Sequence, residues 1–323
     1  MQASPVWRYR LFNRVLESNL EINLLQEFHG NVSHESPVVR IAVSSKPLEP
    51  RGELYIGGEG FPVSHFVGDT QDFAVLNNTG YVASISKDGL LVSVHPDSRG
   101  DAGSTPETAR RVADTLVTAV LSRLPIQWGT PAIHGATLST PHGTVVVVGQ
   151  SGYGKSTLSQ VFQRDFSWEL LDDDTVLIDA EAPIPTLVPM GAAARIRADA
   201  AANLQIQGDK LRGYSGGKIA IPNIAQLGAL ANVGVAMPMA IVELSPAESD
   251  PILQVEVVDP VRAIPALWAN VFTTDASREQ SERRFRAAQL LAESRLVRAT
   301  YQRGLHSPEA LAQEIRARIS SMA

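Results

Sequence analysis

One short motif constrains the fold of this chain more than any other feature of the sequence. The residues from Gly149 to Ser156 read GQSGYGKS and match G-x-x-x-x-G-K-[ST] at every fixed position. Four valines precede the motif, and Leu158, Val161 and Phe162 recur at helical spacing after it. The order buried strand, glycine-rich turn and helix is typical of a phosphate-binding loop (P-loop), so we expect an α/β fold around it.

The chemistry of such a loop is specific. Glycines let the backbone N–H groups wrap a phosphate, and the helix N-terminus adds a positive dipole. Lys155 can reach the β- and γ-phosphates, and the Ser156 hydroxyl can ligate Mg²⁺. The sequence therefore predicts a bound nucleoside triphosphate. The predicted nucleotide-binding residues are Gly149, Ser151, Gly152, Tyr153, Gly154, Lys155, Ser156 and Thr157.

Three carboxylates follow the next predicted strand, Trp168–Leu171. Asp172, Asp173 and Asp174 are adjacent and repel one another unless a cation or a hydrogen-bond donor lies among them. Beside a P-loop, one acid would help to hold Mg²⁺ and a neighbour could accept a proton from an attacking hydroxyl. The alternative is a solvated turn in which one acid acts as a cap.

A third element, His134-Gly135, lies ahead of the valine strand. A histidine alone at such a position is more often a hydrogen-bonded core residue. Together, His134-Gly135, the P-loop and Asp173-Asp174 resemble the HPr kinase/phosphorylase family, which has a His-Gly, a strand, GxSGxGKS, a helix and an Asp-Asp pair. Asp172 with Asp173 is a competing alignment of the acid pair.

This resemblance implies ATP and Mg²⁺ as cofactors and phosphoryl transfer to a hydroxyl, typically a serine of a peptide or protein. In its terms Lys155 and Ser156 hold the nucleotide and the metal. One of Asp173 and Asp174 acts as the base while its neighbour, Asp174 in the preferred alignment, supports the metal. His134 would lie close to the transferred phosphate. The catalytic residues implied are thus Asp173, Asp174, His134 and Lys155.

The resemblance also implies a fold and an assembly. We expect a P-loop kinase core of the HPr kinase/PEP carboxykinase type over residues 104–323, and a homo-oligomer is compatible with the family. The glycine-rich segment that supports phosphorolysis in the bifunctional enzymes is not found after the acids. We therefore expect kinase activity without phosphorolysis, on an acceptor other than HPr.

Residues 1–103 are expected to form a β-rich N-terminal domain. Val38–Ser44 and Glu53–Ile56 have strand composition, and Asp88-Gly89 supplies turn residues between two further runs. A loop over 96–104 marks the boundary, and a helix with Val112, Leu116, Ala119 and Val120 on one face follows it.

Further cations could contact the phosphates or the substrate. The preferred candidates are Arg195, Arg197 and Lys218, with Lys210 and Arg212 as others, although a solvated loop lysine is an equal alternative for Lys218. The arginines of 277–303 are interspersed with glutamates, which favours a solvated helix face over a partner site.

Composition excludes several classes of protein. The 323 residues contain no cysteine, which removes disulfides, thiol catalysis and iron–sulfur clusters. A net charge of −6 argues against a nucleic-acid partner. The uncharged stretch 219–242 contains two prolines and several polar residues, so we expect no membrane partner and a cytoplasmic location.

Two other functions remain open at this stage. The acceptor hydroxyl could belong to a small metabolite, with the same mechanism. Alternatively, the chain could be a regulatory protein that binds ATP without turnover, although such a protein has no need of Asp173 and Asp174 beside the phosphates.

Overall fold

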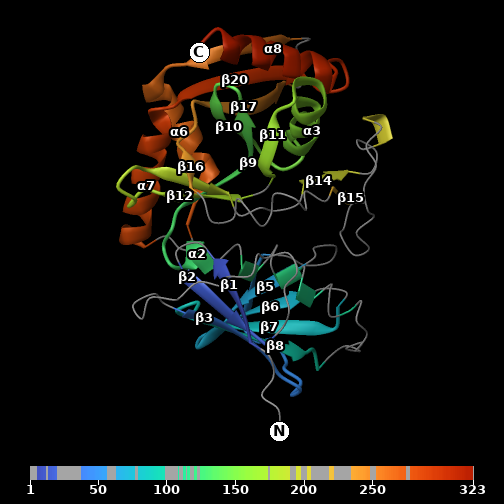
Figure 1. Ribbon diagram of the computed structural model, residues 1–323, viewed down its shortest axis with the longest axis vertical. Coiled ribbons are helices and arrows are strands. Elements are labelled where there is room, and N and C mark those ends of the chain that lie inside the picture. Colours follow the sequence, from blue (N-terminus) through green and yellow to red (C-terminus); the bar gives the residue numbers. More distant parts are fainter. Residues whose placement is uncertain are drawn as a thin grey trace. The chain divides into compact units, whose positions relative to one another are not determined.

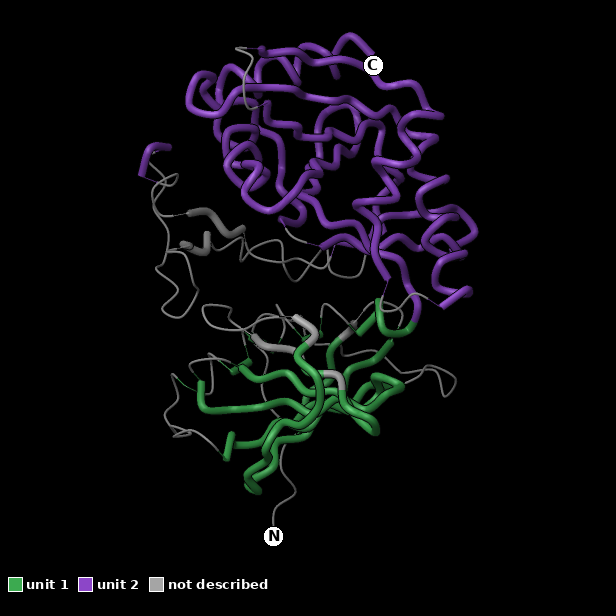
Figure 2. Tube along the Cα trace, turned by 180° about the vertical axis from the view of Figure 1, so that it is seen from behind, with its two compact units in different colours: residues 1–128, 210–218, 227–232 green, residues 129–209, 219–226, 233–323 purple. Residues whose placement is uncertain are grey.

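The computed structural model describes residues 6–11, 14–19, 38–56, 63–76, 79–98, 108, 112–113, 115–116, 120–121, 124–173, 175–189, 194–197, 202–204, 218–221, 234–247, 252–273 and 277–322. Contacts divide the chain into two compact units, which are coloured in Figure 2. Unit 1 comprises Met1–Trp128, Lys210–Lys218 and Leu227–Asn232; unit 2 comprises Gly129–Asp209, Ile219–Gln226 and Val233–Ala323.

Unit 1 is built on one eight-stranded sheet of order β1-β2-β3-β8-β7-β6-β5-β4. Its strands are β1 (Trp7–Leu11), β2 (Arg14–Ser18), β3 (Val38–Val43), β4 (Glu53–Ile56), β5 (Val63–Val67), β6 (Gln71–Leu76), β7 (Tyr81–Ser86) and β8 (Leu91–Pro96). β3 pairs in parallel with β2 and with β8, and the other neighbours pair antiparallel. The β-rich character expected for this part of the chain is present.

Two local predictions for unit 1 can be compared with the structure. Gly89 has a φ of 66°, as the Asp-Gly turn requires. Val112, Leu116 and Val120 are helical and buried, as their spacing predicts. Ala119 lies outside the described residues.

Unit 1 extends beyond the boundary expected near residue 103, which itself lies outside the described residues. The short helix α2 (Leu124–Gln127) is followed by Trp128. The side chains of Gln127 and Trp128 both donate hydrogen bonds to the β7–β8 turn. Gln127 Nε2 donates to the carbonyls of Ser86 (3.2 Å) and Lys87 (3.0 Å), and Trp128 Nε1 donates to that of Asp88 (3.1 Å). These bonds hold the segment to the sheet, and the contacts therefore divide after Trp128.

Unit 2 contains a ten-stranded mixed sheet, whose main path runs β16-β13-β12-β9-β10-β17-β20-β18 (Figure 1). β11 and β19 also pair with β9. The strands are β9 (Ala132–Thr140), β10 (Gly143–Val148), β11 (Glu169–Asp172), β12 (Thr175–Asp179), β13 (Thr186–Pro189), β16 (Val235–Ala236), β17 (Ala240–Ala247), β18 (Leu253–Val258), β19 (Val271–Phe272) and β20 (Arg295–Gln302).

Helices cover both faces of this sheet. They are α3 (Lys155–Phe166), α6 (Pro260–Asn270), α7 (Arg278–Ala292) and α8 (Pro308–Ser320). One core contains Val145 and Val147 with residues of α3 and α8, and a second contains Val146 and Val148 with residues of α6 and α7. Alternate valines of β10 thus point to opposite cores, which explains why this strand is apolar at consecutive positions.

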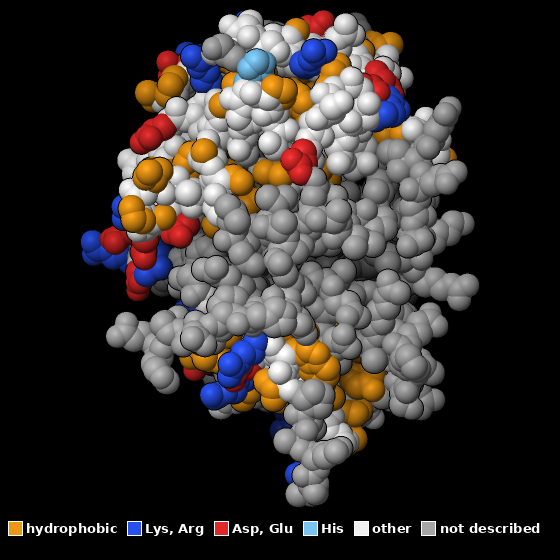
Figure 3. Space-filling view, in the orientation of Figure 1, with side chains coloured by type: hydrophobic (Ala, Val, Ile, Leu, Met, Phe, Trp, Pro, Cys, Tyr) orange, Lys and Arg blue, Asp and Glu red, His pale blue; other side chains and the backbone are white. Residues whose placement is uncertain are grey.

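The described helices include none that is long and apolar enough to cross a membrane. α7 is the arginine-rich helix predicted near the C-terminus. Its charges are mixed, since Arg278 and Arg283 each pair with a glutamate one turn away. Basic and acidic side chains accordingly lie together on this part of unit 2 in Figure 3.

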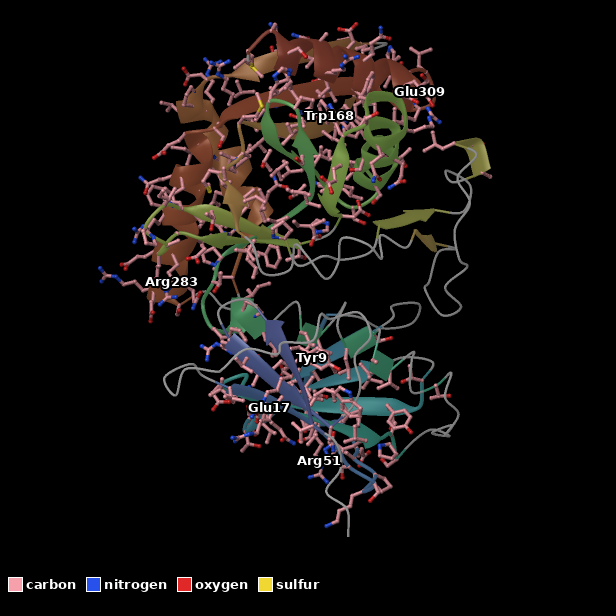
Figure 4. All side chains as sticks on the ribbon, in the orientation of Figure 1. Tyr9, Glu17, Arg51, Trp168, Arg283 and Glu309 are labelled. Atoms are coloured by element: carbon pink, nitrogen blue, oxygen red, sulfur yellow. The ribbon has the colours of Figure 1, made fainter. Side chains whose placement is uncertain are left out.

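Aromatic packing fixes α3 against the sheet. Phe162 is fully buried and stacks on Trp168, with ring centroids 4.3 Å apart and an interplanar angle of 12°. Figure 4 labels Trp168 beside α3 in the interior of unit 2. Phe166, one turn further along α3, is only partly buried, with its ring 6.0 Å from that of Phe162.

Replacing these two phenylalanines tests which contact holds the helix. Phe162→Ala is expected to lower the free energy of unfolding by about 3–5 kcal/mol, because it leaves a cavity beneath Trp168. Phe166→Ala, the matched control, should cost about 1–2 kcal/mol since its side chain is partly solvated already. Urea titration measures both; equal losses would contradict the assignment of Phe162 as the main contact.

Candidate phosphate-binding site

The P-loop joins β10 to α3, in the order that the sequence predicts. Gly152 and Gly154 have φ values of 83° and 90°, a region that favours glycine because it has no side chain. Inside the loop the Tyr153 N–H donates to the Gln150 carbonyl at 3.1 Å. The glycines of the motif are therefore required by the backbone path of the loop.

The N-terminus of α3 opens directly onto this loop. Gly154 is the N-cap and supplies no side-chain acceptor. The Leu158 N–H bonds back to the Gly154 carbonyl at 2.8 Å. The first N–H groups of a helix have no acceptor within the helix, which makes such an N-terminus a ready site for an anion.

The Lys155 side chain is held at the loop by backbone oxygens. It is only 7% exposed, and Nζ donates to the carbonyls of Gly149 (2.7 Å) and Gln150 (3.3 Å). A buried ammonium is stable only among such oxygens. The geometry thus places one positive charge and several backbone N–H groups around the same turn, as phosphate binding requires.

Strand β9 connects the P-loop to the predicted catalytic residues. β9 pairs antiparallel with β10, and Gly135 lies opposite Val148, the last residue before the loop. On its other edge β9 pairs with β12, and His134 lies opposite Thr175. His134 is therefore placed between the start of the P-loop and the turn that carries the acids.

The extended segment after α3 is not continuous, because it breaks at Asp173 into β11 and β12. Asp172 is fully buried, and its Oδ1 accepts the Thr175 N–H at 3.2 Å. This bond closes the turn, which gives Asp172 a structural role. Asp173 is 5% exposed and lies in the turn that ends beside His134, while Asp174 lies outside the described residues.

The additional cations are described only by their backbone. Arg195 and Arg197 lie on β14 (Ala194–Arg197), which pairs with β15 (Lys218–Ile221) in a separate two-stranded sheet and contacts α3. Their side chains and that of Lys218 lie outside the description, as do Lys210 and Arg212. Their roles at the phosphates stay predictions.

Two residues that sequence reasoning did not assign contact the P-loop. The Arg303 guanidinium lies 5.0 Å above the Tyr153 ring, and the Tyr301 hydroxyl donates to the Tyr153 carbonyl. Burial raises the pKa of Tyr301, which keeps the hydroxyl protonated as a donor. The sequence signal for these contacts was the run Tyr301-Gln-Arg-Gly304, which lies ahead of Ser307-Pro308, a capping residue followed by a first-turn proline.

No group of three or more histidine, aspartate or glutamate side chains able to hold a metal occurs among the residues with described positions. Mg²⁺ does not require one, because it binds through one or two carboxylates together with substrate phosphates and water. The Ser156 hydroxyl and the carboxylate of Asp173 are oxygen donors of the kind that Mg²⁺ prefers. The donor set therefore fits Mg²⁺.

No family model and no curated protein matches this chain. Among solved structures, the chain is similar to that of the Hpr(Ser) kinase/phosphatase from Coxiella burnetii. The identity is 15% and the TM-score 0.29, over 58% of this chain and 98% of that chain. The mixed α/β architecture is plain from the sheet and its helices, and function has to be derived from the residues of this chain.

Replacing Gly135 tests whether β9 can hold a side chain where it packs against β10. A side chain added there would place its Cβ 2.7 Å from the Val147 carbonyl oxygen, which is backbone and has little freedom to move. Gly135→Ala should lower the free energy of unfolding by about 1–3 kcal/mol. Ser139→Ala, on the same strand, should change it by less than about 0.5 kcal/mol. Equal urea midpoints for the two variants would show that β9 tolerates the methyl group.

Proposed function

We propose that this protein is an ATP-dependent phosphotransferase that transfers the γ-phosphoryl group to a hydroxyl, with a serine of a peptide or protein as the acceptor. The observation that carries the proposal is the pairing of β9 with both β10 and β12. β10 ends opposite Gly135, next to His134, and His134 lies opposite Thr175, where the turn that carries Asp173 ends. A protein that only bound nucleotide would need the P-loop but not the buried carboxylate beside it.

The step itself assigns a task to each group. The acceptor oxygen forms a bond to the γ-phosphorus while the bond from that phosphorus to the β–γ bridging oxygen breaks, and ADP leaves with the electron pair. The hydroxyl proton passes to the carboxylate of Asp173 or its neighbour Asp174. Lys155 and the N–H groups of the P-loop orient the phosphates and offset their negative charge.

The metal has a defined place in this proposal. Ser156 and one carboxylate of the pair Asp173 and Asp174 would hold Mg²⁺, which when bound neutralises charge on the β- and γ-oxygens. In this proposal His134, which lies on β9 next to Gly135 and opposite Thr175, would contact the transferred group. Positioning and charge neutralisation supply most of the catalysis in reactions of this class.

Lys155→Ala tests the nucleotide site. The variant loses the charge held at the loop and should bind ATP at least about tenfold more weakly, a loss of about 1.4 kcal/mol or more. Isothermal titration with ATP and Mg²⁺ measures it. Lys87→Ala removes a lysine from the β7–β8 turn of unit 1 and should bind as the parent does. Unchanged binding by Lys155→Ala would remove the P-loop assignment.

Asp173→Asn separates binding from transfer. We expect ATP affinity within about threefold of the parent and a transfer rate lower by about 10²–10⁴, because the amide cannot accept the proton. The assay is incubation with γ-labelled ATP and a cell lysate, followed by identification of the labelled species.

The species that carries the label from γ-labelled ATP identifies the acceptor. Label on a peptide serine supports the proposal, and label on a small metabolite keeps the mechanism but changes the substrate class. Asp179→Asn, at the far end of β12, is the matched control and should transfer at the parent rate. Full activity in Asp173→Asn would assign the base to another group.

A further inference from the structure

We propose that the pocket between the P-loop and the β20–α8 loop binds the nucleoside part of the triphosphate, and that Arg303 and Leu305 determine its affinity. This proposal rests on the proposed function. The pocket has a volume of about 470 Å³. Its lining comprises residues 152–154, Thr157 and Leu158 of the P-loop and α3, and Tyr301, residues 303–308 and Leu311 of β20, the following loop and α8.

The position of the pocket relative to the acids favours the nucleoside over the acceptor. In the sheet order β12-β9-β10-β17-β20, the P-loop follows β10, the central strand of these five. The acid turn precedes β12, two strands to one side, and the pocket loop follows β20, two strands to the other. A triphosphate whose γ-group faces the acids therefore directs its nucleoside toward this pocket.

The chemistry of the lining agrees with that placement. Arg303 is the single side chain of formal charge among the lining residues, and no carboxylate is present among them. The surroundings are mostly apolar, which suits the flat face of a base better than a phosphate. The Arg303 guanidinium already lies 5.0 Å from the centre of the Tyr153 ring. The His306 Nδ1 accepts a hydrogen bond from the Gln302 N–H at 3.3 Å.

The pocket is also continuous with the phosphate site. Tyr153, Gly154 and Thr157 belong both to the pocket lining and to the P-loop or the first turn of α3. The Tyr301 hydroxyl bonds to the Tyr153 carbonyl, so the last strand and the loop are tied together at this point. A ligand bound by its phosphates can thus enter the pocket without leaving the P-loop.

The experiment compares ATP with inorganic tripolyphosphate, which carries the phosphates without a nucleoside. Isothermal titration of the full chain with each ligand gives the ratio of the two dissociation constants. We expect ATP to bind about tenfold tighter or more, and Arg303→Ala and Leu305→Ala each to lower that ratio at least about threefold. Leu305 is 59% exposed, so its replacement does not threaten the fold.

Arg316→Ala is the matched control. Its guanidinium lies 4.7 Å above the Phe166 ring, the same arrangement as Arg303 on Tyr153, but Arg316 does not line the pocket. The ratio for this variant should stay within about twofold of the parent because only a distant charge is lost.

The outcomes separate this proposal from the function on which it rests. If tripolyphosphate binds in a Lys155-dependent manner and ATP binds no tighter, the P-loop assignment stands and the nucleoside pocket is overturned. A ratio unchanged in both pocket variants, with a raised KM for the acceptor, places the acceptor here and also overturns it. If neither ligand binds, the proposed function fails and this proposal fails with it.

Discussion

The lack of a side chain at Gly135 is the constraint on which the site depends, because a Cβ there would lie 2.7 Å from the Val147 carbonyl oxygen. It lets β9 pack against β10 at a point where a side chain would meet backbone. Because β9 also pairs with β11 and β12, its register fixes the P-loop on one edge and the acid turn on the other. The start of the P-loop and the end of the acid turn thereby lie at the same level along β9, on its two sides.

Much of the fold was predictable because the signals are local. The valines of β10, the cap and proline that begin α8, and the arginine-rich pattern of α7 each act within their own element. β9 was not predicted as a strand, since AIHGATLST mixes apolar, polar and glycine residues. The strand conformation of these residues is explained by the sheet, in which β9 pairs with a neighbour on both sides and Gly135 has no room for a side chain.

The candidate site likewise contains residues that the sequence predicts and contacts that it does not. A phosphate-binding loop could be predicted from sequence because its motif lies in eight consecutive residues, and the structure joins that motif to a strand and a helix in the predicted order. The role of Asp172 could not, because three adjacent aspartates are equivalent until the hydrogen bond to Thr175 distinguishes one of them. The contacts of Arg303 and Tyr301 with Tyr153 join residues far apart in the chain, and no local pattern predicts them.

The protein's net charge of −6 fits an anion site that works at short range. Lys155, the P-loop N–H groups and the α3 dipole act within a few ångströms, whereas Arg278, Arg283 and Arg284 of α7 have other partners. Arg283 pairs with Glu279, and Arg284 bonds to the Trp268 carbonyl and stacks on its ring. A phosphate would therefore be held by local geometry and not by a broad positive field.

This arrangement also separates the two ends of the proposed ligand. The reactive end would be served by β9 and β12 and the nucleoside end by β20 and α8, and only β10 and α3 are common to both. Under this proposal, substitutions in the β20–α8 loop would alter nucleotide preference while leaving His134 and Asp173 in place. Substitutions at β9 act on both, because the register of that strand sets where the P-loop begins.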